Sequence, residues 1–232
     1  MKSRRIDFDG LAAFYRPLEL LAFGRDLERA RFCFINELRD CRRILVLGEG
    51  DGRFLARLVR TVPGAWIHCV DSSPAMQELA ISRISGTGAE GRVTFEQADM
   101  LSGSLDPGTY DAVVTLFFLD CFTPEQVAAV VARVRQGLRG CARWLFADFA
   151  LPRRGILRLR ARIWLKVLYL FFGWSTSMAV RSLPPSEDIL MKSGFRRVAT
   201  RDFQWGLVRS AVFVLPDCGI APPHCEPLPV ER

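Results

Sequence analysis

One stretch, "RILVLGEGDGRFLARL" at residues 43–58, constrains the fold more than any other part of the chain. An apolar run enters a loop with glycine at alternate positions, Gly48, Gly50 and Gly52. A strand, a glycine loop and a helix in that order present backbone N–H groups and a helix N-terminus to a ligand. We therefore expect a ligand site where this loop leaves the sheet.

Short apolar runs alternate with helix-length segments along most of the sequence. Ser73 and Thr123 are suitable N-caps followed by proline, which predicts helices that begin at residues 74 and 124. Ser186 is expected to cap a short helix that ends at Gly194. Strands that alternate with helices imply an α/β fold, a doubly wound sheet with helices on both faces. The expected strands are 43–48, 66–71, 93–99, 110–118, 142–149, 196–204 and 207–215.

With 232 residues, 50% hydrophobic and 25% charged, the chain is long enough for one full core. We expect a single domain over residues 1–216, with an N-terminal helical lid at 1–40, a cap insertion at 151–185 and a Pro-rich tail at 217–232. The N-terminus lacks the apolar core of a signal peptide and the seven cysteines are scattered, so we expect a cytoplasmic protein with free thiols. No metal site is expected, because Cys218, His224 and Cys225 lack a fourth ligand.

The formal net charge of +7 has its origin in one segment. Residues 151–181 hold seven basic residues and no acidic one, and Arg158, Arg162 and Lys166 form one stripe of an amphipathic helix. Two interpretations stay open: a cap helix with a solvated basic face, or docking on an anionic membrane surface or an acidic substrate. In the second, residues 156–174 form a lid over the acceptor site and make peripheral contact with the membrane. The balanced remainder, without a basic stripe, argues against a nucleic-acid partner.

The glycine loop carries two carboxylates, Glu49 and Asp51, which argue against a dinucleotide. Arg53 replaces the last glycine of G-x-G-x-x-G, and a carboxylate in a low-dielectric cleft repels a pyrophosphate. S-adenosylmethionine has a sulfonium, an α-amino group and no phosphate, so it suits an acidic loop. At the ends of the next two strands, Asp71 can accept both ribose hydroxyls and Asp99 can accept from the adenine amino group.

Each of these side chains also has a structural interpretation. Asp71 can cap the helix that follows it, and Asp99 can be a turn residue. Met100, Phe117 and Phe118 lie at strand ends, where apolar residues more often belong to the core than to a ligand site. Asp71 and Asp99 occur together at the ends of successive expected strands, which favours the ligand site.

Four stretches carry a family resemblance: "VLGEGDGRF", "VDSSPAM", "FEQADML" and "YDAVVTLFFLDCF". They stand in order at the ends of expected strands, and over residues 10–215 the chain resembles the class I S-adenosylmethionine-dependent methyltransferases. The resemblance implies a Rossmann-like sheet of strand order 3-2-1-4-5-7-6 with the last strand antiparallel, S-adenosylmethionine as cofactor and S-adenosylhomocysteine as product. It implies a cofactor site made of Gly48, Glu49, Gly50, Gly52, Asp71, Ser72, Met76, Asp99, Met100, Phe117 and Phe118.

Methyl transfer from a sulfonium is an in-line displacement, in which alignment of the acceptor contributes about 7–11 kcal/mol. A base is needed only if the acceptor must lose a proton. Asp120 in "FFLDCF" and Asp148 in "LFADF" are the candidates, because both lie near the carboxyl ends of central strands. Either can instead be a helix cap or a surface carboxylate. His68 lies inside a strand and is expected to be a core residue.

No tetrapeptide of the N-P-P-Y type follows the fourth strand, where "FFLD" stands instead, so a small-molecule acceptor is favoured over a nucleic acid. The apolar and basic cap indicates an amphipathic or lipid-like acceptor, methylated on a hydroxyl or carboxyl oxygen. The alternatives are a non-catalytic cofactor-binding or scaffold module and an NAD(P)-dependent oxidoreductase. Candidate acceptor contacts are Tyr15 and Arg16 in the lid and Tyr169 and Arg181 in the cap.

Overall fold

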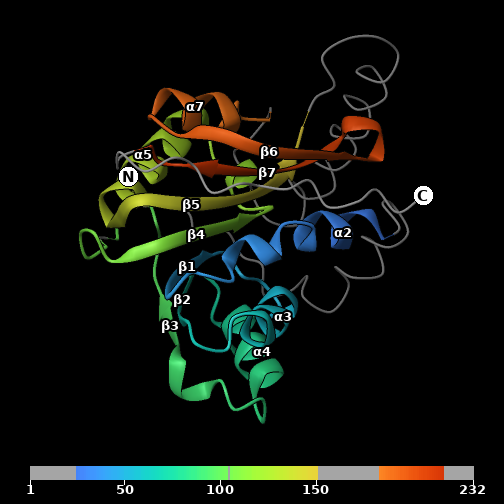
Figure 1. Ribbon diagram of the computed structural model, residues 1–232, viewed down its shortest axis with the longest axis vertical. Coiled ribbons are helices and arrows are strands. Elements are labelled where there is room, and N and C mark those ends of the chain that lie inside the picture. The colour runs from blue at the N-terminus through green and yellow to red at the C-terminus, as the bar shows by residue number, and fades with distance from the viewer. Residues whose placement is uncertain (1–24, 104, 151–182, 217–232) are drawn as a thin grey trace.

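The computed structural model describes residues 25–103, 105–150 and 183–216 (Figure 1). Its seven strands form one sheet in the order β3-β2-β1-β4-β5-β7-β6, in which β1 to β5 are parallel and β7 is antiparallel to both neighbours. The predicted fold class and strand order are confirmed. The strands are β1 (Arg43–Leu47), β2 (Trp66–Asp71), β3 (Val93–Gln97), β4 (Tyr110–Leu116), β5 (Leu138–Phe149), β6 (Arg196–Phe203) and β7 (Val208–Val214).

Helices cover both faces of the sheet (Figure 1). They are α2 (Asp26–Phe32), α3 (Arg53–Thr61), α4 (Pro74–Ile84), α5 (Pro124–Gly137) and α7 (Ser186–Lys192), with the short 3-10 helices η1 (Ile35–Leu38), η2 (Glu90–Arg92), η3 (Leu119–Cys121) and η4 (Gln204–Gly206). Successive side chains of β1 point to opposite faces of the sheet and belong to two separate cores. Ile44 and Val46 pack with α3 and α4, whereas Leu45 and Leu47 pack with α5 and α7. α2 packs against β7 through Leu27.

The predicted capping residues begin two of the helices. Ser73 Oγ accepts a hydrogen bond at 3.2 Å from a backbone N–H in the first turn of α4. Thr123 forms a reciprocal capping box with Gln126 at the start of α5. The prediction for Ser186 is wrong, because Pro185 occupies the N-cap position and Ser186 is the first helical residue. The proline ring fixes φ there, which ends the extended segment before the helix.

Strand β5 begins at Leu138, earlier than the predicted start at residue 142. α5 ends at Gly137 and Leu138 already pairs with Tyr110 of β4, so no loop separates the helix from the strand. The register with β4 then shifts, and Cys141 has a φ of 62°. Three exposed residues in succession follow Leu138, and this break in the alternation conceals the first part of the strand in the sequence.

The strand order brings the carboxyl ends of β1, β2, β4 and β5 to one edge of the sheet. Leu47 of β1 pairs with Val70 of β2 and with Thr115 of β4. Leu116 of β4 pairs with Ala147 of β5. Crossovers after β1 and after β4 turn to opposite sides, and open α/β sheets bind ligands at such a switch point. The topology therefore places the predicted site residues at this carboxyl edge.

Several predictions fall on parts of the chain outside the described residues. These parts are the lid before residue 25, the basic segment 156–174 and the tail 217–232. The domain boundaries and the membrane contact stay predictions for this reason. Within the described ranges, no helix combines the length and the apolarity that crossing a bilayer requires.

Gly52 is expected to tolerate no side chain. Its φ is +82°, and a Cβ would lie 2.6 Å from Ala80 Cα of α4, so an added methyl group meets backbone. Gly50 is the matched control, because its φ is +69° but no described atom lies within 4 Å of the Cβ position. We expect Gly52→Ala to lower the free energy of unfolding by about 3 kcal/mol and Gly50→Ala by about 1 kcal/mol, measured by chemical denaturation. Equal losses would mean that φ alone, and not the contact with α4, requires glycine.

Candidate functional site

The glycine loop between β1 and α3 is fixed at both ends and open in the middle. Gly48 has a φ of +66°, and its N–H donates to Val70 O at 2.9 Å. A Cβ at Gly48 would lie 2.4 Å from the ring of Phe118, and one at Gly52 would meet α4. Between them, no atom of the described residues lies within 4 Å of a Cβ at Gly50. Such a loop is a backbone cradle that a ligand can approach closely.

Glu49 is buried in this loop with one carboxylate oxygen unused. Its Oε1 accepts from Leu55 N at 2.8 Å and so caps the N-terminus of α3. Its Oε2 has no hydrogen-bond partner among the described residues. Burial raises the pKa of Glu49 to about 8, against the lowering effect of the Leu55 N–H. Asp51 and Asp71 add to the rise, and Arg31 of α2 opposes it. A positive charge beside Oε2 would favour the ionised form.

The second carboxylate of the loop, Asp51, is already paired. Its Oδ2 lies 2.9 Å from Nε of Arg53 and 3.3 Å from Nη2 of Arg83. Arg83 Nε also donates to the backbone oxygen of Asp51 at 2.7 Å. The expectation that both loop carboxylates serve a positively charged ligand is therefore wrong, because two arginines already neutralise Asp51. Glu49 alone remains for that role.

Asp71 ends β2 and connects the loop to α4. Its Oδ2 accepts from Gly50 N at 3.4 Å, and its Oδ1 accepts from Ser73 N at 2.9 Å. Burial raises the pKa of Asp71, while these backbone N–H groups lower it. The carboxylate thus helps to order the start of α4 and also adjoins the open middle of the loop. Ser72 is exposed beside it, and Met76 is half-buried in the first turn of α4.

The two residues predicted as cofactor contacts after β3, Asp99 and Met100, occupy a turn and the core, respectively. Asp99 is exposed, and its Oδ1 accepts from Leu101 N at 2.9 Å in an Asx turn. Met100 is 5% exposed and packs in the same core as Val70. A cofactor contact of Asp99 and Met100 stays a prediction.

Two aromatic rings follow β4 at the carboxyl edge. Phe117 has a φ of 56°, a strained value for a residue other than glycine, and its N–H donates to Ala147 O at 2.7 Å. The guanidinium of Arg31 lies 5.0 Å from the centroid of the Phe117 ring. Phe118 packs against Gly48. Phe118 therefore borders the glycine loop on the β4 side, whereas the Phe117 ring lies beside Arg31 of α2.

Asp120 and Asp148, predicted separately, form a hydrogen-bonded pair. Asp120 N donates to Asp148 Oδ2 at 3.0 Å, and the two carboxyl groups also hydrogen-bond to each other. Burial raises both pKa values, that of Asp120 to about 6, and the charge of Asp120 raises that of Asp148 further. Of the two, Asp148 has the stronger tendency to hold a proton, because burial and the charge of Asp120 both raise its pKa. Asp148 is 2% exposed, whereas Asp120 is partly exposed as a residue, so Asp120 is the member of the pair nearer to the surface.

Two further residues of this edge, Arg31 and Cys121, carry no sequence signal. Arg31 reaches the Phe117 ring from α2, and Cys121 Sγ donates to Asp120 Oδ1 at 3.6 Å. Their placement depends on tertiary packing, which no local motif encodes. Outside the described residues lie the predicted acceptor contacts Tyr15, Arg16, Tyr169 and Arg181.

The prediction that His68 is a core residue is wrong. Its side chain is 22% exposed, its Nδ1 lies 2.6 Å from Tyr110 Oη and its Nε2 lies 3.1 Å from Glu96 Oε2. These polar partners on β4 and β3 explain how the sheet accommodates an imidazole. Tyr110 is the first residue of β4, so this group lies away from the carboxyl edge.

Comparisons with known proteins agree with this geometry. A family model described as "Methyltransferase domain" matches residues 44–140. The ubiquinone/menaquinone biosynthesis C-methyltransferase UbiE of Syntrophotalea carbinolica is 30% identical over 216 residues, which cover 87% of this chain and 89% of the relative. The demethylmenaquinone methyltransferase of Thermus thermophilus is 30% identical over 186 residues, which cover 78% of this chain and 83% of the relative.

Solved structures with the same fold share less sequence. The S-adenosylmethionine-dependent methyltransferase SibL, in its apo form, has a TM-score of 0.65 at 20% identity over 93% of this chain and 64% of that chain. The mitomycin 7-O-methyltransferase MmcR has a TM-score of 0.63 at 18% identity over 90% of this chain and 60% of that chain. The chain thus spans less than two thirds of these neighbours. At such identities the likeness establishes a common fold alone.

Glu49 makes the stability of the ligand-free protein depend on pH. Its pKa is about 8 in the folded state against about 4.3 in an unfolded chain. The folded state binds the extra proton between these values, so stability is lost as the pH rises through them. We expect Glu49→Gln to remove this loss and to gain about 4 kcal/mol in unfolding free energy, relative to the native protein, between pH 5 and pH 8.5.

Urea denaturation across this pH range measures the effect, with the exposed Glu78→Gln of α4 as control. The control profile should run parallel to that of the native protein. If the profile of Glu49→Gln is parallel as well, Glu49 is ionised in the folded protein throughout the range.

Proposed function

The chain belongs to the class I S-adenosylmethionine-dependent methyltransferases, and we propose that its acceptor is a small amphipathic or lipid-like molecule of the quinone type. Support comes from two relatives that cover most of this chain, a ubiquinone/menaquinone biosynthesis C-methyltransferase and a demethylmenaquinone methyltransferase. The name of the first points to a carbon acceptor rather than to the hydroxyl or carboxyl oxygen expected from the sequence. We therefore propose methylation of a ring carbon.

The observation that carries the cofactor assignment is the unused Oε2 of Glu49. The buried carboxyl group of Glu49 lies next to the open backbone of Gly50 and fits a ligand with positive charge, which would favour its ionised form. A pyrophosphate would gain no such attraction there, which disfavours the NAD(P) alternative. S-adenosylmethionine carries such charge on its sulfonium and amino groups, and it supplies an activated methyl group when bound. We assign its methionine part to Gly48, Glu49 and Gly50, and its ribose hydroxyls to Asp71.

The other predicted contacts have one of two roles: they hold the glycine loop in place, or they line the edge of the cofactor site. Gly52 packs against α4 and so holds the loop in place. The ring of Phe118 limits the loop on the β4 side, and we assign the neighbouring Phe117 to the same border of the cofactor site. The remaining proposed border contacts are Ser72, Met76, Asp99 and Met100.

A ring carbon that gains a methyl group must lose a proton, and we assign its uptake to Asp120. This residue is partly exposed at the carboxyl edge, and with a pKa of about 6 it is mostly ionised at neutral pH. Asp148 is buried, which raises its pKa, and its Oδ2 accepts from Asp120 N. Asp148 is therefore a positioning residue, which holds the carboxylate of Asp120 in place.

The base assignment predicts a pH profile. Because only ionised Asp120 accepts a proton, kcat/KM should rise about tenfold per pH unit below pH 6 and level off above it. Asp120→Asn should lose about 100-fold in kcat/KM and the rise with pH, while its affinity for S-adenosylhomocysteine is retained. The exposed Asp106→Asn is the matched control. An unchanged profile in Asp120→Asn would mean that the acceptor needs no base from this pair.

Transfer of a radiolabelled methyl group tests the acceptor class. The purified protein is incubated with methyl-labelled S-adenosylmethionine and a cell extract, which is then divided into organic and aqueous phases. We expect the label in an organic-soluble compound of the quinone type, and no transfer by Glu49→Lys, which places a positive charge in the cofactor loop. Label confined to water-soluble compounds or to protein would contradict the lipid-like acceptor. A lack of S-adenosylmethionine binding in calorimetry would contradict the cofactor assignment instead.

A further inference from the structure

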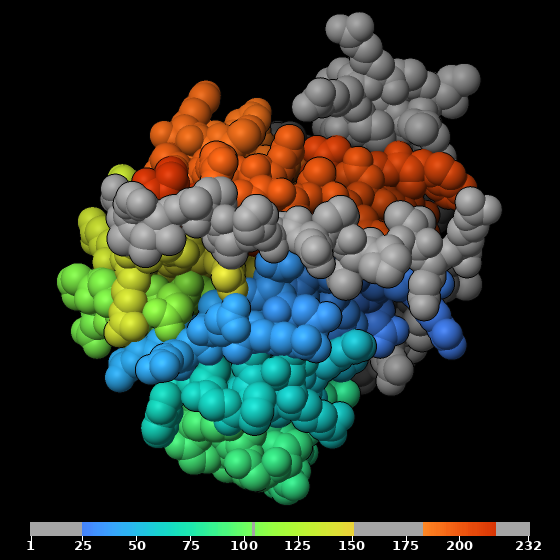
Figure 2. Space-filling model, in the orientation of Figure 1, coloured from blue at the N-terminus to red at the C-terminus, as the bar shows by residue number. Residues whose placement is uncertain are grey.

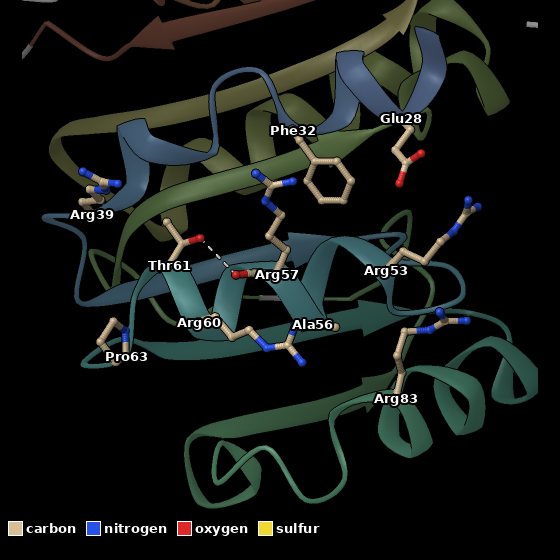
Figure 3. Close-up of a pocket in the computed structure, with 10 residues that line it drawn as sticks. All are labelled: Glu28, Phe32, Arg39, Arg53, Ala56, Arg57, Arg60, Thr61, Pro63 and Arg83. Carbon is tan, nitrogen blue, oxygen red and sulfur yellow. Dashed lines mark hydrogen bonds between the residues drawn. The ribbon is translucent and has the colours of Figure 1, made fainter. Parts of the chain in front are cut away.

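A groove lined by arginines runs along the outer face of α3, between η1 and α2 on one side and α4 on the other (Figure 3). Its volume is about 1040 Å³. Arg53 and Arg83 lie at one end of the groove and Arg39 at the other (Figure 3). In the space-filling view, the blue surface of α2 and η1 adjoins the cyan surface of α3 (Figure 2). The charged side chains that line the groove are Glu28, Arg39, Arg53, Arg57, Arg60 and Arg83.

The basic side of the groove has a simple origin in the sequence of α3, "RFLARLVRT". Arg53, Arg57 and Arg60 have the spacing that puts them on one face of a helix, and α3 contains no acidic residue. Its other face, with Leu55 and Leu58, is buried in the core. The expectation that the chain outside 151–181 lacks a basic stripe is therefore wrong. Acidic residues balance the total charge of the chain outside 151–181, but among the lining residues of the groove only Glu28 is acidic, against five arginines.

Three of the five arginines have no carboxylate partner among the described residues. Arg53 and Arg83 pair with Asp51, but neither Arg39 nor Arg60 takes part in an ion pair or side-chain hydrogen bond within the described ranges. The guanidinium of Arg57 lies 4.9 Å from the ring centroid of Phe32, which orients the charge without neutralising it. Both Arg57 and Arg60 are exposed. Like charges held close together attract a bound anion.

We propose that this groove binds a soluble ligand that carries several linked phosphate groups. Planar guanidinium groups match phosphate oxygens with two parallel hydrogen bonds. The stripe from Arg53 to Arg60 extends about 10 Å along the helix, which is longer than one phosphate group and fits a chain of them. Arginines of α3 and α4 line the groove together, so one discrete ligand can contact arginines of both helices. Phe32, Ala56 and Pro63 add apolar lining for an organic part of the ligand.

Calorimetry with inorganic tripolyphosphate and the full chain tests the proposal. We expect one binding site whose affinity falls as the salt concentration rises. The double variant Arg39→Gln/Arg60→Gln removes two arginines that have no described partner, and should bind at least about tenfold more weakly. The matched control is Arg135→Gln/Arg196→Gln, which removes two exposed arginines from α5 and β6 and should stay within about twofold of the native affinity. All three proteins should bind S-adenosylhomocysteine equally, which verifies the fold independently of methyl transfer.

Two results would overturn the proposal. Equal weakening in both double variants would mean that tripolyphosphate responds to net charge and not to the groove. Failure to bind tripolyphosphate, together with sedimentation of the native protein but not of Arg39→Gln/Arg60→Gln with phosphatidylglycerol vesicles, would make the ligand a membrane headgroup.

Discussion

Close contact of two neighbouring elements with loop backbone determines the whole carboxyl edge. The ring of Phe118 lies against Gly48, and α4 lies against Gly52, so that any Cβ at either position would overlap with them. The chain between β1 and α3 can therefore pass only as a glycine loop. This path points Glu49 inward, onto the N-terminus of α3, and leaves Gly50 facing open space. The close contacts thus determine where the ligand site forms, and the charge of Glu49 only determines which ligand suits it.

The buried carboxylate of Glu49 links stability to ligand binding. The Leu55 N–H and the positive end of α3 favour its ionised form, but burial outweighs them and raises the pKa to about 8. Ionisation therefore destabilises the ligand-free protein. A cation beside Oε2 would lower the pKa of Glu49 again, because its charge stabilises the carboxylate in place of the solvent that burial has removed. The group that weakens the free protein is thus the one that strengthens the complex.

Local signals predicted the fold because each element carries its own. β-branched runs mark the strands, and Ser73 and Thr123 mark the starts of two helices. The ion-pair partner of a side chain, in contrast, cannot be predicted from its local sequence. Asp51 is a loop carboxylate like Glu49, yet it forms ion pairs with Arg53 and with Arg83 of α4, and the second of these partners is distant along the chain. The pairing of Asp120 with Asp148 lies between the two cases, because it follows once β4 and β5 are known to be parallel neighbours.

Charge in this protein is sorted in space, although the sequence outside 151–181 is balanced. The basic stripe of α3 begins at Arg53, directly after the last glycine of the acidic loop. Asp51 lies at this boundary and pairs with Arg53 and Arg83, so opposite charges meet at the partly exposed start of one helix. On one side of these ion pairs, Glu49 adjoins the open loop. On the other side, the groove is lined by arginines that have no carboxylate partner within the described ranges. A cationic ligand, which would favour the ionised form of Glu49, and a phosphate ligand are thereby directed to different sides of α3.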